Sequence, residues 1–291
     1  MTIPRFEVFS EVIKLGSFTK AAEALHMTQS AVSHSIASLE NEWGVTLLIR
    51  EKGKDLVLTE IGYKILIQVR EILKRIEHIN QEIALQANLE IGTIRIGSFT
   101  SASACLLPKI ISKFHKKYPK IELKLFEGFY EEIMEWLKTG AIDVGFIIEH
   151  DLDCEFYTIP LLEDTIAVAF PENHRFLEKD VIRVKDLKDE PLIMPKGMYQ
   201  SYIEEIFQKA KVQPSVRFEV QDCNTIASMV NEGLGVTVGS ELFLKTQPNI
   251  HTKRLPLENL RKVALACMSK QATTPAVQSF LKVATEVYSH S

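Results

Sequence analysis

The sequence predicts an α+β protein with three parts: an N-terminal winged helix-turn-helix, a long linker helix and a C-terminal α/β domain. Three patterns along the chain support this prediction. Two short amphipathic helical segments joined by a tight turn lie within residues 17–43, and a heptad repeat follows within residues 59–88. From residue 92 onward, β-rich runs alternate with helical runs. We therefore place the parts at residues 1–58, 59–88 and 92–291.

The bulk composition limits the class of protein. A chain of 291 residues with 46% hydrophobic residues is long enough for about two globular domains. It has no apolar run of the length that a membrane span requires, so we expect no membrane association. The N-terminal segment is helix-patterned and carries acidic residues, unlike a secretory signal, which predicts a cytoplasmic protein. The four cysteines lie far apart without a C-x-x-C pair, which indicates buried free thiols.

The helix-turn-helix prediction rests on two apolar stripes and their capping residues. A first helix over residues 4–15, ended by Gly16, is expected to pack behind the pair. Within the pair, Ser17 and Thr28 stand where N-cap residues belong. The apolar stripes of the two helices consist of Phe18, Ala21, Ala22 and Leu25, and of Val32, Ile36, Leu39 and Trp43.

The outward face of the second helix carries short polar or small side chains and no acidic residue before Glu40. A helix that enters a DNA major groove needs such a surface, because it must approach base edges without repelling phosphates. An ordinary helical hairpin with a solvated face would show the same spacing, so the spacing alone is weak evidence. The residues of this face are Gln29, Ser30, Ser33, His34, Ala37 and Ser38.

A β-wing is expected after Gly44, with two short strands that flank a turn at residues 51–54 and with Leu56 and Leu58 facing inward. Positive charge gathers in this segment, where it could bind phosphate groups of DNA. The basic residues of the wing are Arg50, Lys52 and Lys54.

The charge of the first part as a whole argues against DNA binding. Residues 1–58 contain six Lys or Arg against seven Asp or Glu, and the whole chain carries a net charge of −4. Phosphate contacts require local positive charge and backbone N–H groups rather than a basic domain, so the wing could still supply them. Arg50 could equally form a structural ion pair with Glu40.

Thr59 is expected to cap a long helix that continues to about residue 88. The apolar positions of this helix are spaced 4, 3, 4, 3 and 4 residues apart, and no Pro or Gly interrupts it after Gly62. Such a narrow apolar stripe needs a partner. Packing within its own domain is one alternative, and pairing with the same helix of a second subunit is the better explanation. The residues of the stripe are Ile65, Val69, Ile72, Ile76, Ile79 and Ile83.

The alternation of β-rich and helical runs after residue 92 is typical of an open α/β sheet. No motif for nucleophilic, phosphate-transfer or metal-dependent catalysis occurs in it, and the eight histidines of the chain are scattered. We therefore expect no enzyme, no metal and no cofactor. Strands are expected at residues 93–97, 121–126, 143–148, 165–170, 191–194, 216–220, 235–239 and 263–268, and helices at 106–117, 130–138, 201–211, 224–232 and 275–288.

A polar stretch over residues 97–103 is the most informative feature of this part. It follows a strand and opens a helix, so its N–H groups and hydroxyls could bind a small anion. The alternative is simple N-capping by Thr100 or Ser101, although one cap needs only one hydroxyl. We expect no Arg next to this stretch, so a monocarboxylate is a better candidate ligand than a phosphate ester. The candidate hydroxyls are those of Thr100, Ser101 and Ser103.

Several motifs together resemble those of the LysR-type transcriptional regulators, and the resemblance extends over the whole chain. It departs at His34, where the family often has Arg, and at Leu48 and Ile61, which replace the more usual Phe and Ala. The motifs are Ala21-Ala22-x-x-Leu25, Thr28-Gln29-x-Ala31-Val32-Ser33, Leu39-Glu40, Gly44-x-x-Leu47, Arg50 and Leu58-Thr59-x-x-Gly62, followed by Leu107-Pro108, Tyr118-Pro119, Gly140-x-x-Asp143 and Gly233-x-Gly235.

The resemblance implies that the C-terminal α/β domain has two lobes and is similar to periplasmic solute-binding proteins. By analogy, the chain would cross between the lobes near Glu163 and return near Met268. Lobe I would then comprise about residues 92–163 and 268–291, and lobe II about residues 164–267.

The resemblance also implies a cleft between the lobes in which an effector binds. It places Ser101 in this cleft, with Phe129 at another position of the same cleft. Residues 195–200 would face them from lobe II, and Asn224 and Thr225 would begin a helix beside that segment.

A member of this family would be a one-component transcriptional regulator that binds double-stranded promoter DNA and responds to a small-molecule effector. Its linker helix would form a homodimer, and the family commonly forms tetramers. One alternative is a ligand-binding protein or enzyme of the solute-binding fold, in which residues 1–90 serve only for oligomerisation. Another is a redox-responsive regulator, which the wide spacing of Cys154 and Cys223 supports poorly. The DNA contacts would come from Thr28, Gln29, Ser30, Ser33, His34, Arg50, Lys52 and Lys54.

Overall fold

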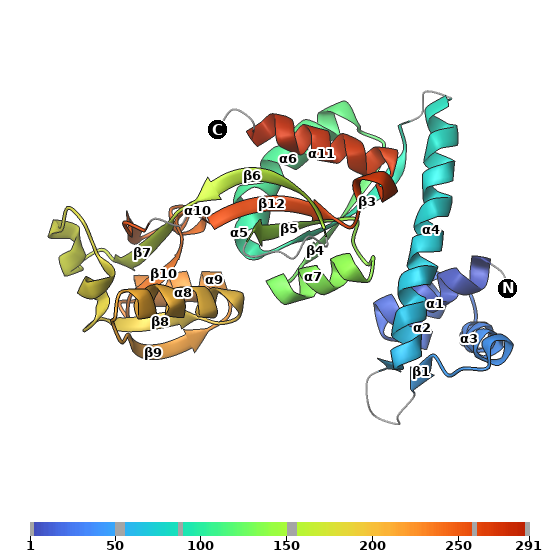
Figure 1. Ribbon diagram of the computed structural model, residues 1–291, viewed down its shortest axis with the longest axis horizontal. Coiled ribbons are helices and arrows are strands. Elements are labelled where there is room, and N and C mark those ends of the chain that lie inside the picture. Colours follow the sequence, from blue (N-terminus) through green and yellow to red (C-terminus); the bar gives the residue numbers. More distant parts are fainter. Residues whose placement is uncertain (1–2, 50–55, 87–89, 150–155, 258–260, 289–291) are drawn as a thin grey trace.

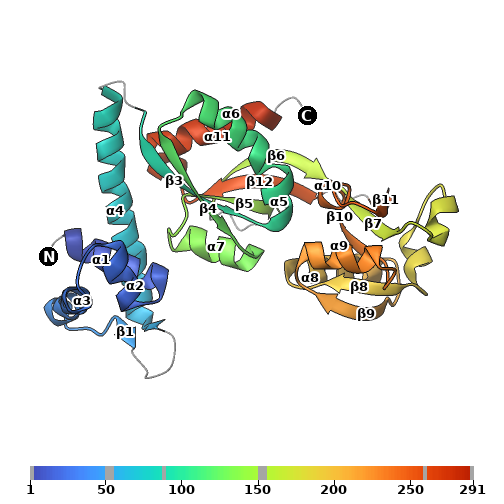
Figure 2. The same ribbon diagram turned by 180° about the vertical axis from the view of Figure 1, so that it is seen from behind.

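The protein is elongated, with its N-terminal domain and linker helix at one end and two lobes following in a row (Figure 1). The view from behind shows the same order (Figure 2). The computed structural model describes residues 3–49, 56–86, 90–149, 156–257 and 261–288. The wing residues Arg50, Lys52 and Lys54, together with Cys154, therefore lie outside the described residues.

The N-terminal domain consists of three helices and a two-stranded antiparallel sheet. The elements are α1 (Ile3–Leu15), α2 (Phe18–Ala24), α3 (Gln29–Trp43), β1 (Leu48–Ile49) and β2 (Val57–Leu58). The predicted caps are confirmed: the Ser17 hydroxyl accepts from the Lys20 N–H at 3.3 Å, and the Thr28 hydroxyl accepts from the Ala31 N–H at 3.2 Å. Gly44 ends α3 in the left-handed conformation, with φ 66°.

The linker helix α4 (Glu60–Gln86) leaves the wing through a close backbone contact. The hydroxyl of Thr59 accepts from the Gly62 N–H at 2.9 Å, which confirms Thr59 as the cap. A Cβ atom at Gly62 would lie 2.2 Å from the carbonyl oxygen of Leu47. Only glycine therefore allows α4 to lie this close to the strand that follows Leu47.

The two sides of α4 differ in what they contact. Leu66 and Val69 pack into the core of the N-terminal domain. Ile72, Ile79 and Ile83 lie on the other side, with 42%, 59% and 65% of their surface exposed. The prediction that Val69 belongs to a seam for a second subunit is therefore wrong, because only 2% of its surface is exposed and its neighbours are residues of its own domain.

Lobe I is built on a five-stranded sheet in the order β4-β3-β5-β12-β6. Helices α6 and α11 cover one face, where the rings of Phe114 and Phe280 lie 5.3 Å apart, and α7 covers the other (Figure 1). Neighbouring residues of β5 face opposite sides: Phe146 packs in the core cluster of α6 and α11, and Ile147 in that of α7. The elements are β3 (Gly92–Ser98), α5 (Thr100–Cys105), α6 (Leu107–Lys117), β4 (Ile121–Glu127), α7 (Tyr130–Lys138), β5 (Val144–Glu149), β6 (Tyr157–Asp164), β12 (Arg261–Cys267) and α11 (Pro275–Tyr288).

Lobe II contains two small sheets, ordered β10-β7-β11 and β8-β9, and a bridge between Leu192 and Val236 joins them. Its core includes Phe170, Phe176 and Phe207. The elements are β7 (Ile166–Pro171), η1 (Arg175–Glu178), η2 (Val184–Leu187), β8 (Pro191–Pro195), α8 (Met198–Lys209), β9 (Ser215–Val220), α9 (Cys223–Asn231), β10 (Thr237–Ser240), α10 (Glu241–Leu244) and β11 (Ile250–Arg254).

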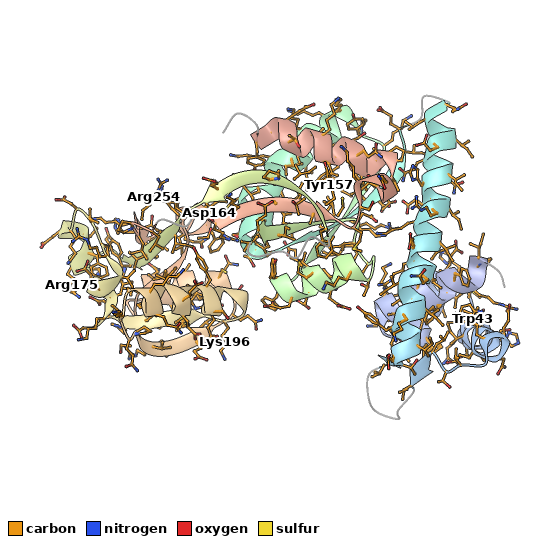
Figure 3. All side chains as sticks on the ribbon, in the orientation of Figure 1. Trp43, Tyr157, Asp164, Arg175, Lys196 and Arg254 are labelled. Atoms are coloured by element: carbon orange, nitrogen blue, oxygen red, sulfur yellow. The ribbon has the colours of Figure 1, made fainter. Side chains whose placement is uncertain are left out.

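The chain crosses between the lobes at Thr165, where β6 ends and β7 begins. It returns before Arg261, because β12 pairs with β5 and β6 in the sheet of lobe I. The expected return near Met268 is therefore wrong, and β12 belongs to lobe I rather than lobe II. Asp164, at the outward crossing, pairs in register with Arg261, and Figure 3 labels it at the junction of the lobes.

Candidate functional site

The outward face of α3 presents a compact polar surface. Thr28, Gln29, Ser30 and His34 are exposed, and Ser33 is half-buried. The Thr28 hydroxyl lies 3.0 Å from that of Ser30 and also caps α3, so part of its hydrogen-bonding capacity is used within the protein. The side chains of Gln29 and His34 have no hydrogen bond to another described residue, so they are available to an external partner.

The carboxylate of Glu40 holds the segment that leads from α3 into the wing. Its Oε1 atom accepts from the backbone N–H of Leu47 at 2.7 Å and of Leu48 at 3.2 Å. This carboxylate therefore positions β1 by binding backbone groups that would otherwise be unpaired. Its engagement with backbone groups gives Glu40 a structural role independent of Arg50, which lies outside the described residues.

A second candidate site lies where the two lobes meet. A cavity of about 40 Å³ opens there, lined by Ser101 of lobe I and otherwise by residues of lobe II. The side chain of Ser101 is buried, with 6% of its surface exposed. The wall of the cavity is mostly apolar and includes Pro195, Cys223, Ile226, Phe243 and Leu244.

The hydroxyl groups around this cavity differ in their hydrogen bonds. Thr237 donates to the carbonyl oxygen of Ile193 at 2.9 Å, and Ser240 donates to Asp164 at 2.5 Å. Ser101 has no hydrogen bond to another described residue. The cavity therefore offers a ligand one hydroxyl from lobe I within a largely apolar surface.

The alternative of simple N-capping in this stretch is wrong. Phe99 occupies the N-cap position of α5, and no side-chain hydrogen bond caps this helix. The hydroxyls of Thr100 and Ser101 are therefore not used as caps. Ser103 lies further along α5, where its buried hydroxyl has no partner among the described residues, and neither Thr100 nor Ser103 lines the cavity.

The remaining predicted ligand contacts lie around the cavity rather than on its wall. Phe129 follows β4 at the same edge of the sheet as Ser98, since the Gly128 N–H donates to the Ser98 carbonyl oxygen at 3.2 Å. Asn224 and Thr225 are exposed, and the Thr225 hydroxyl donates to Asp222 at 2.7 Å. Helix α9 instead turns Cys223 and Ile226 toward the cavity, because residues three apart share a helix face.

Arg261 is a charged residue near this site that the sequence reasoning missed. Its guanidinium lies 5.1 Å from the ring centre of Phe99, directly before α5, and donates to Asp164 at 2.8 Å. The expectation that no Arg lies next to the polar stretch is therefore wrong. Phe99 and Arg261 are far apart in the sequence, and only the insertion of β12 beside β6 brings them together. Asp164 balances the charge of Arg261, so the pair adds little net charge to the cleft.

The described cysteines do not form a reactive site. Burial raises the pKa of the Cys105 and Cys223 thiols above the ordinary value, and raises that of Cys267 to about 11. The thiolate is the reactive form of cysteine, so burial favours the less reactive, protonated form of these three thiols at neutral pH. No group of three or more potential metal ligands occurs among the described residues. None of the helices in the described part of the chain has both the length and the apolar character needed to span a bilayer.

A helix-turn-helix at one end and a two-lobed domain with a cavity at its junction at the other are the architecture of one class of protein: a transcriptional regulator that carries its own sensor. Family models bear this out along the chain. Residues 3–63 match the bacterial regulatory helix-turn-helix protein of the lysR family, and residues 87–289 match the LysR substrate binding domain. The chain belongs to the LysR family of transcriptional regulators.

Individual relatives and structures agree with this family. The chain is 40% identical to the HTH-type transcriptional regulator YvbU of Bacillus subtilis over 291 residues, which covers 99% of each chain. It is 29% identical to the transcriptional dual regulator GltC of the same organism, over 96% of this chain and 98% of that protein. Full-length OxyR of Pseudomonas aeruginosa has the same fold, with a TM-score of 0.76, 23% identity and coverage of 99% and 97% of the two chains. CbnR in complex with its target DNA gives a TM-score of 0.68 at 19% identity, over 99% of this chain and 100% of that chain.

Membership of this family decides between a transcriptional regulator and a solute-binding protein or enzyme. LysR-type proteins are transcriptional regulators rather than enzymes, they bind promoter DNA and small-molecule effectors, and they are oligomeric. The N-terminal domain is therefore a DNA-binding domain and not merely an oligomerisation module, which rejects the alternative of a solute-binding protein or enzyme.

Proposed function

We propose that this regulator reads promoter DNA with α3, dimerises through the exposed face of α4 and senses a small monocarboxylate in the cleft beside Ser101. Each of the three steps has its own support in the described residues. Regulation of transcription would place the protein in the cytoplasm, where promoter DNA is accessible.

The recognition step belongs to the start of α3. Gln29 is exposed in the first turn of the helix, and its amide can donate to and accept from one adenine at the same time. Ser33, one turn further on, can reach the same or the next base step. Thr28, Ser30 and His34 surround these two residues and would contact the sugar-phosphate backbone or neighbouring base edges.

The wing would position α3 on the DNA. Arg50, Lys52 and Lys54 supply dense positive charge, which binds phosphate groups without regard to sequence. The segment that leads into the wing is held by Glu40 through the backbone N–H groups of Leu47 and Leu48. This anchoring supports a fixed relation between the recognition helix and the wing.

The exposed apolar face of α4 supports a homodimer. Isoleucine side chains on this face are about half exposed in the single chain, which is unfavourable in water. A second copy of the same helix would cover them, and the two-fold symmetry would place two recognition helices on one face of the DNA. Ile76 is half-buried and could also belong to this face, whereas Ile65 packs against the core of its own N-terminal domain. Assembly of two such dimers would give the tetramer that is common in this family.

The cleft would bind a small ligand with one hydrogen-bonding group and an apolar remainder. The observation that carries this proposal is the cavity at the lobe junction, where Ser101 of lobe I meets apolar residues of lobe II. The single hydroxyl and the balanced Arg261–Asp164 pair favour at most one negative charge on the ligand. At about 40 Å³ the cavity admits only a very small molecule, so a larger ligand requires the lobes to separate.

A ligand that favours one arrangement of the two lobes would shift the equilibrium between the arrangements. A rotation of the subunits would then change the spacing between the two recognition helices α3.

A thermal-shift screen of small monocarboxylates against the wild type and the Ser101→Val variant tests this site. Valine removes the hydroxyl, and its side chain is one heavy atom larger than that of serine. Loss of the hydroxyl alone should weaken binding by about 1–2 kcal/mol. The matched control is Thr100→Val, one position earlier on α5 and outside the cavity wall, which should bind as the wild type does. Equal stabilisation of wild type and Ser101→Val by every hit would place the ligand elsewhere.

A further inference from the structure

The inner face of α4 carries polar side chains that each contact a different element of lobe I in the same chain. Arg70 donates to the carbonyl oxygen of Thr139 at 3.2 Å, at the C-terminal end of α7. Lys74 donates to the carbonyl oxygen of Ile142 at 3.0 Å and lies 2.9 Å from an oxygen of Asp143. These contacts match donors on the helix to unpaired carbonyl and carboxylate oxygens on the lobe.

Two further contacts continue this face toward the end of α4. Glu77 lies 3.3 Å from a guanidinium nitrogen of Arg95 in β3. Gln81, only 4% exposed, accepts from the Ala276 N–H at 3.2 Å with its side-chain oxygen. Ala276 lies in the first turn of α11, where a backbone N–H has no partner within the helix. Gln81 therefore caps a helix of lobe I from outside the lobe.

The contact surface is polar and incompletely packed, unlike the core of a domain. Burial lowers the pKa of Arg70 to about 10, which shows that its charge is largely removed from water. A cavity of about 230 Å³ lies between α4 and lobe I, lined by Ile67 and Glu71 on the helix and by Met268 and Val277 on the lobe. Polar groups of this kind can bind water equally well when separated, so neither arrangement of the two parts leaves them unsatisfied.

The N-terminal domain itself is separated from lobe I by a larger groove. Its volume is about 870 Å³, and it is lined by Glu11 and Leu25 on one side and by Phe126 and Trp136 on the other. The orientation of the DNA-binding domain relative to lobe I is thus governed by the polar face of α4.

We propose that this face of α4, formed by Arg70, Lys74, Glu77 and Gln81, is a releasable docking surface for lobe I of the same chain. In the docked state the recognition helix has one fixed direction relative to the ligand cleft. Release would free the DNA-binding domain and its α4 to turn as a unit, since Leu66 and Val69 keep the helix attached to that domain. The proposal concerns contacts within one subunit and does not depend on the identity of the effector.

Hydrogen exchange in the full-length protein can test the proposal at a single amide. The Ala276 N–H is protected by Gln81 while α4 is docked and loses this partner on release. The variant Arg70→Ala with Lys74→Ala removes three contacts to lobe I but leaves Gln81 in place. We expect exchange at Ala276 to become roughly tenfold faster, which corresponds to about 1.4 kcal/mol less docking free energy.

Matched variants separate release from damage to the fold. Lys64→Ala removes a lysine of the same helix whose partner is Glu60 within α4, so Ala276 should exchange as in the wild type. Lys74→Arg keeps the charge and should preserve most of the protection. Raising the NaCl concentration should speed exchange at Ala276 in the wild type, because salt screens partly exposed ion pairs, but should have little effect on the double variant.

Two results would overturn the proposal. Unchanged protection of Ala276 in the double variant would mean that Arg70 and Lys74 do not hold α4 on lobe I. An equal rise of exchange at Leu265, in the buried strand β12, would mean that the variant unfolds lobe I rather than releasing the helix.

Discussion

Replacing Asp164 by Asn should destabilise the effector-binding domain strongly, although the two side chains have the same size. The Asp164 carboxylate accepts from a guanidinium nitrogen of Arg261 at 2.8 Å, from the Ser240 hydroxyl at 2.5 Å and from the Leu242 N–H at 3.1 Å. The side chains of Asp164 and Arg261 are only 2% and 3% exposed. Asparagine removes the carboxylate charge that faces the buried Arg261 guanidinium, and removing one partner of a buried ion pair costs about 3–5 kcal/mol.

Urea denaturation followed by circular dichroism measures this loss. The matched control is Asp189→Asn, an exposed aspartate of lobe II, which should change the free energy of unfolding by no more than about 0.5 kcal/mol. Combining Asp164→Asn with Arg261→Met removes both charges and should recover most of the stability, because no unbalanced charge stays buried.

A loss below about 1 kcal/mol for Asp164→Asn would contradict this prediction, because the Asp164 carboxylate would then contribute little to balancing the buried Arg261 guanidinium. Failure of the Arg261→Met combination to recover stability would refute it in another way. The cost would then come from the bonds of Asp164 to Ser240 and Leu242 rather than from charge.

Three further predictions concern DNA binding and assembly. Gln29→Ala should cost about 1–3 kcal/mol on the specific site and much less on random DNA, as measured by fluorescence anisotropy; equal losses on both would remove Gln29 from base recognition. Lys52→Ala with Lys54→Ala should reduce the slope of log K against log salt by about one unit for each lost phosphate contact; an unchanged slope would mean that the wing does not touch DNA. Ile72→Asp should give smaller species in analytical ultracentrifugation, because it buries an unpaired charge in the proposed dimer seam; an unchanged mass would place the interface elsewhere.

Local features of the fold could be predicted because nearby residues determine them. The capping roles of Ser17, Thr28 and Thr59 follow from hydroxyls placed just before apolar helical stripes. Gly62 is part of a recognisable motif, but the reason for it is the close approach of the Leu47 carbonyl, which no local pattern reveals. Local capping residues thus predict where helices begin. The contact with the Leu47 carbonyl oxygen, which is distant in sequence, explains why position 62 is glycine.

Strand β6 is not among the strands expected from the sequence, and it contains Pro160, a residue that is unusual inside a strand. The structure resolves the conflict, since β6 is the edge strand of its sheet and the register shifts beside Pro160, between Val263 and Ala264. The lobe boundary near Met268 rests on analogy alone, because the sequence does not show which lobe a strand joins. The apolar run of β12 suits either lobe, and only its pairing with β5 and β6 assigns it to lobe I.

The candidate ligand site also combines residues that the sequence could indicate with residues that only the fold brings there. Ser101 could be singled out from a hydroxyl-rich stretch between a strand and a helix. Arg261 could not, because it reaches Phe99 through the return crossing of a chain segment far away in sequence. Val69 fits the heptad spacing whether α4 packs on a second subunit or on its own domain. Only the contacts between α4 and the N-terminal domain show that Val69 is buried in that domain.

Two copies of α3, held together through α4, should read a specific DNA sequence. Selection of bound duplexes from a random-sequence library by the full-length protein, followed by sequencing, measures this preference. We expect an inverted repeat whose half-sites lie about 10 base pairs apart, centre to centre, or a multiple of that distance. We also expect Gln29→Ala to relax the preference within each half-site. Enrichment of unpaired half-sites would contradict the symmetric dimer, and the absence of any enriched sequence would contradict base recognition by α3.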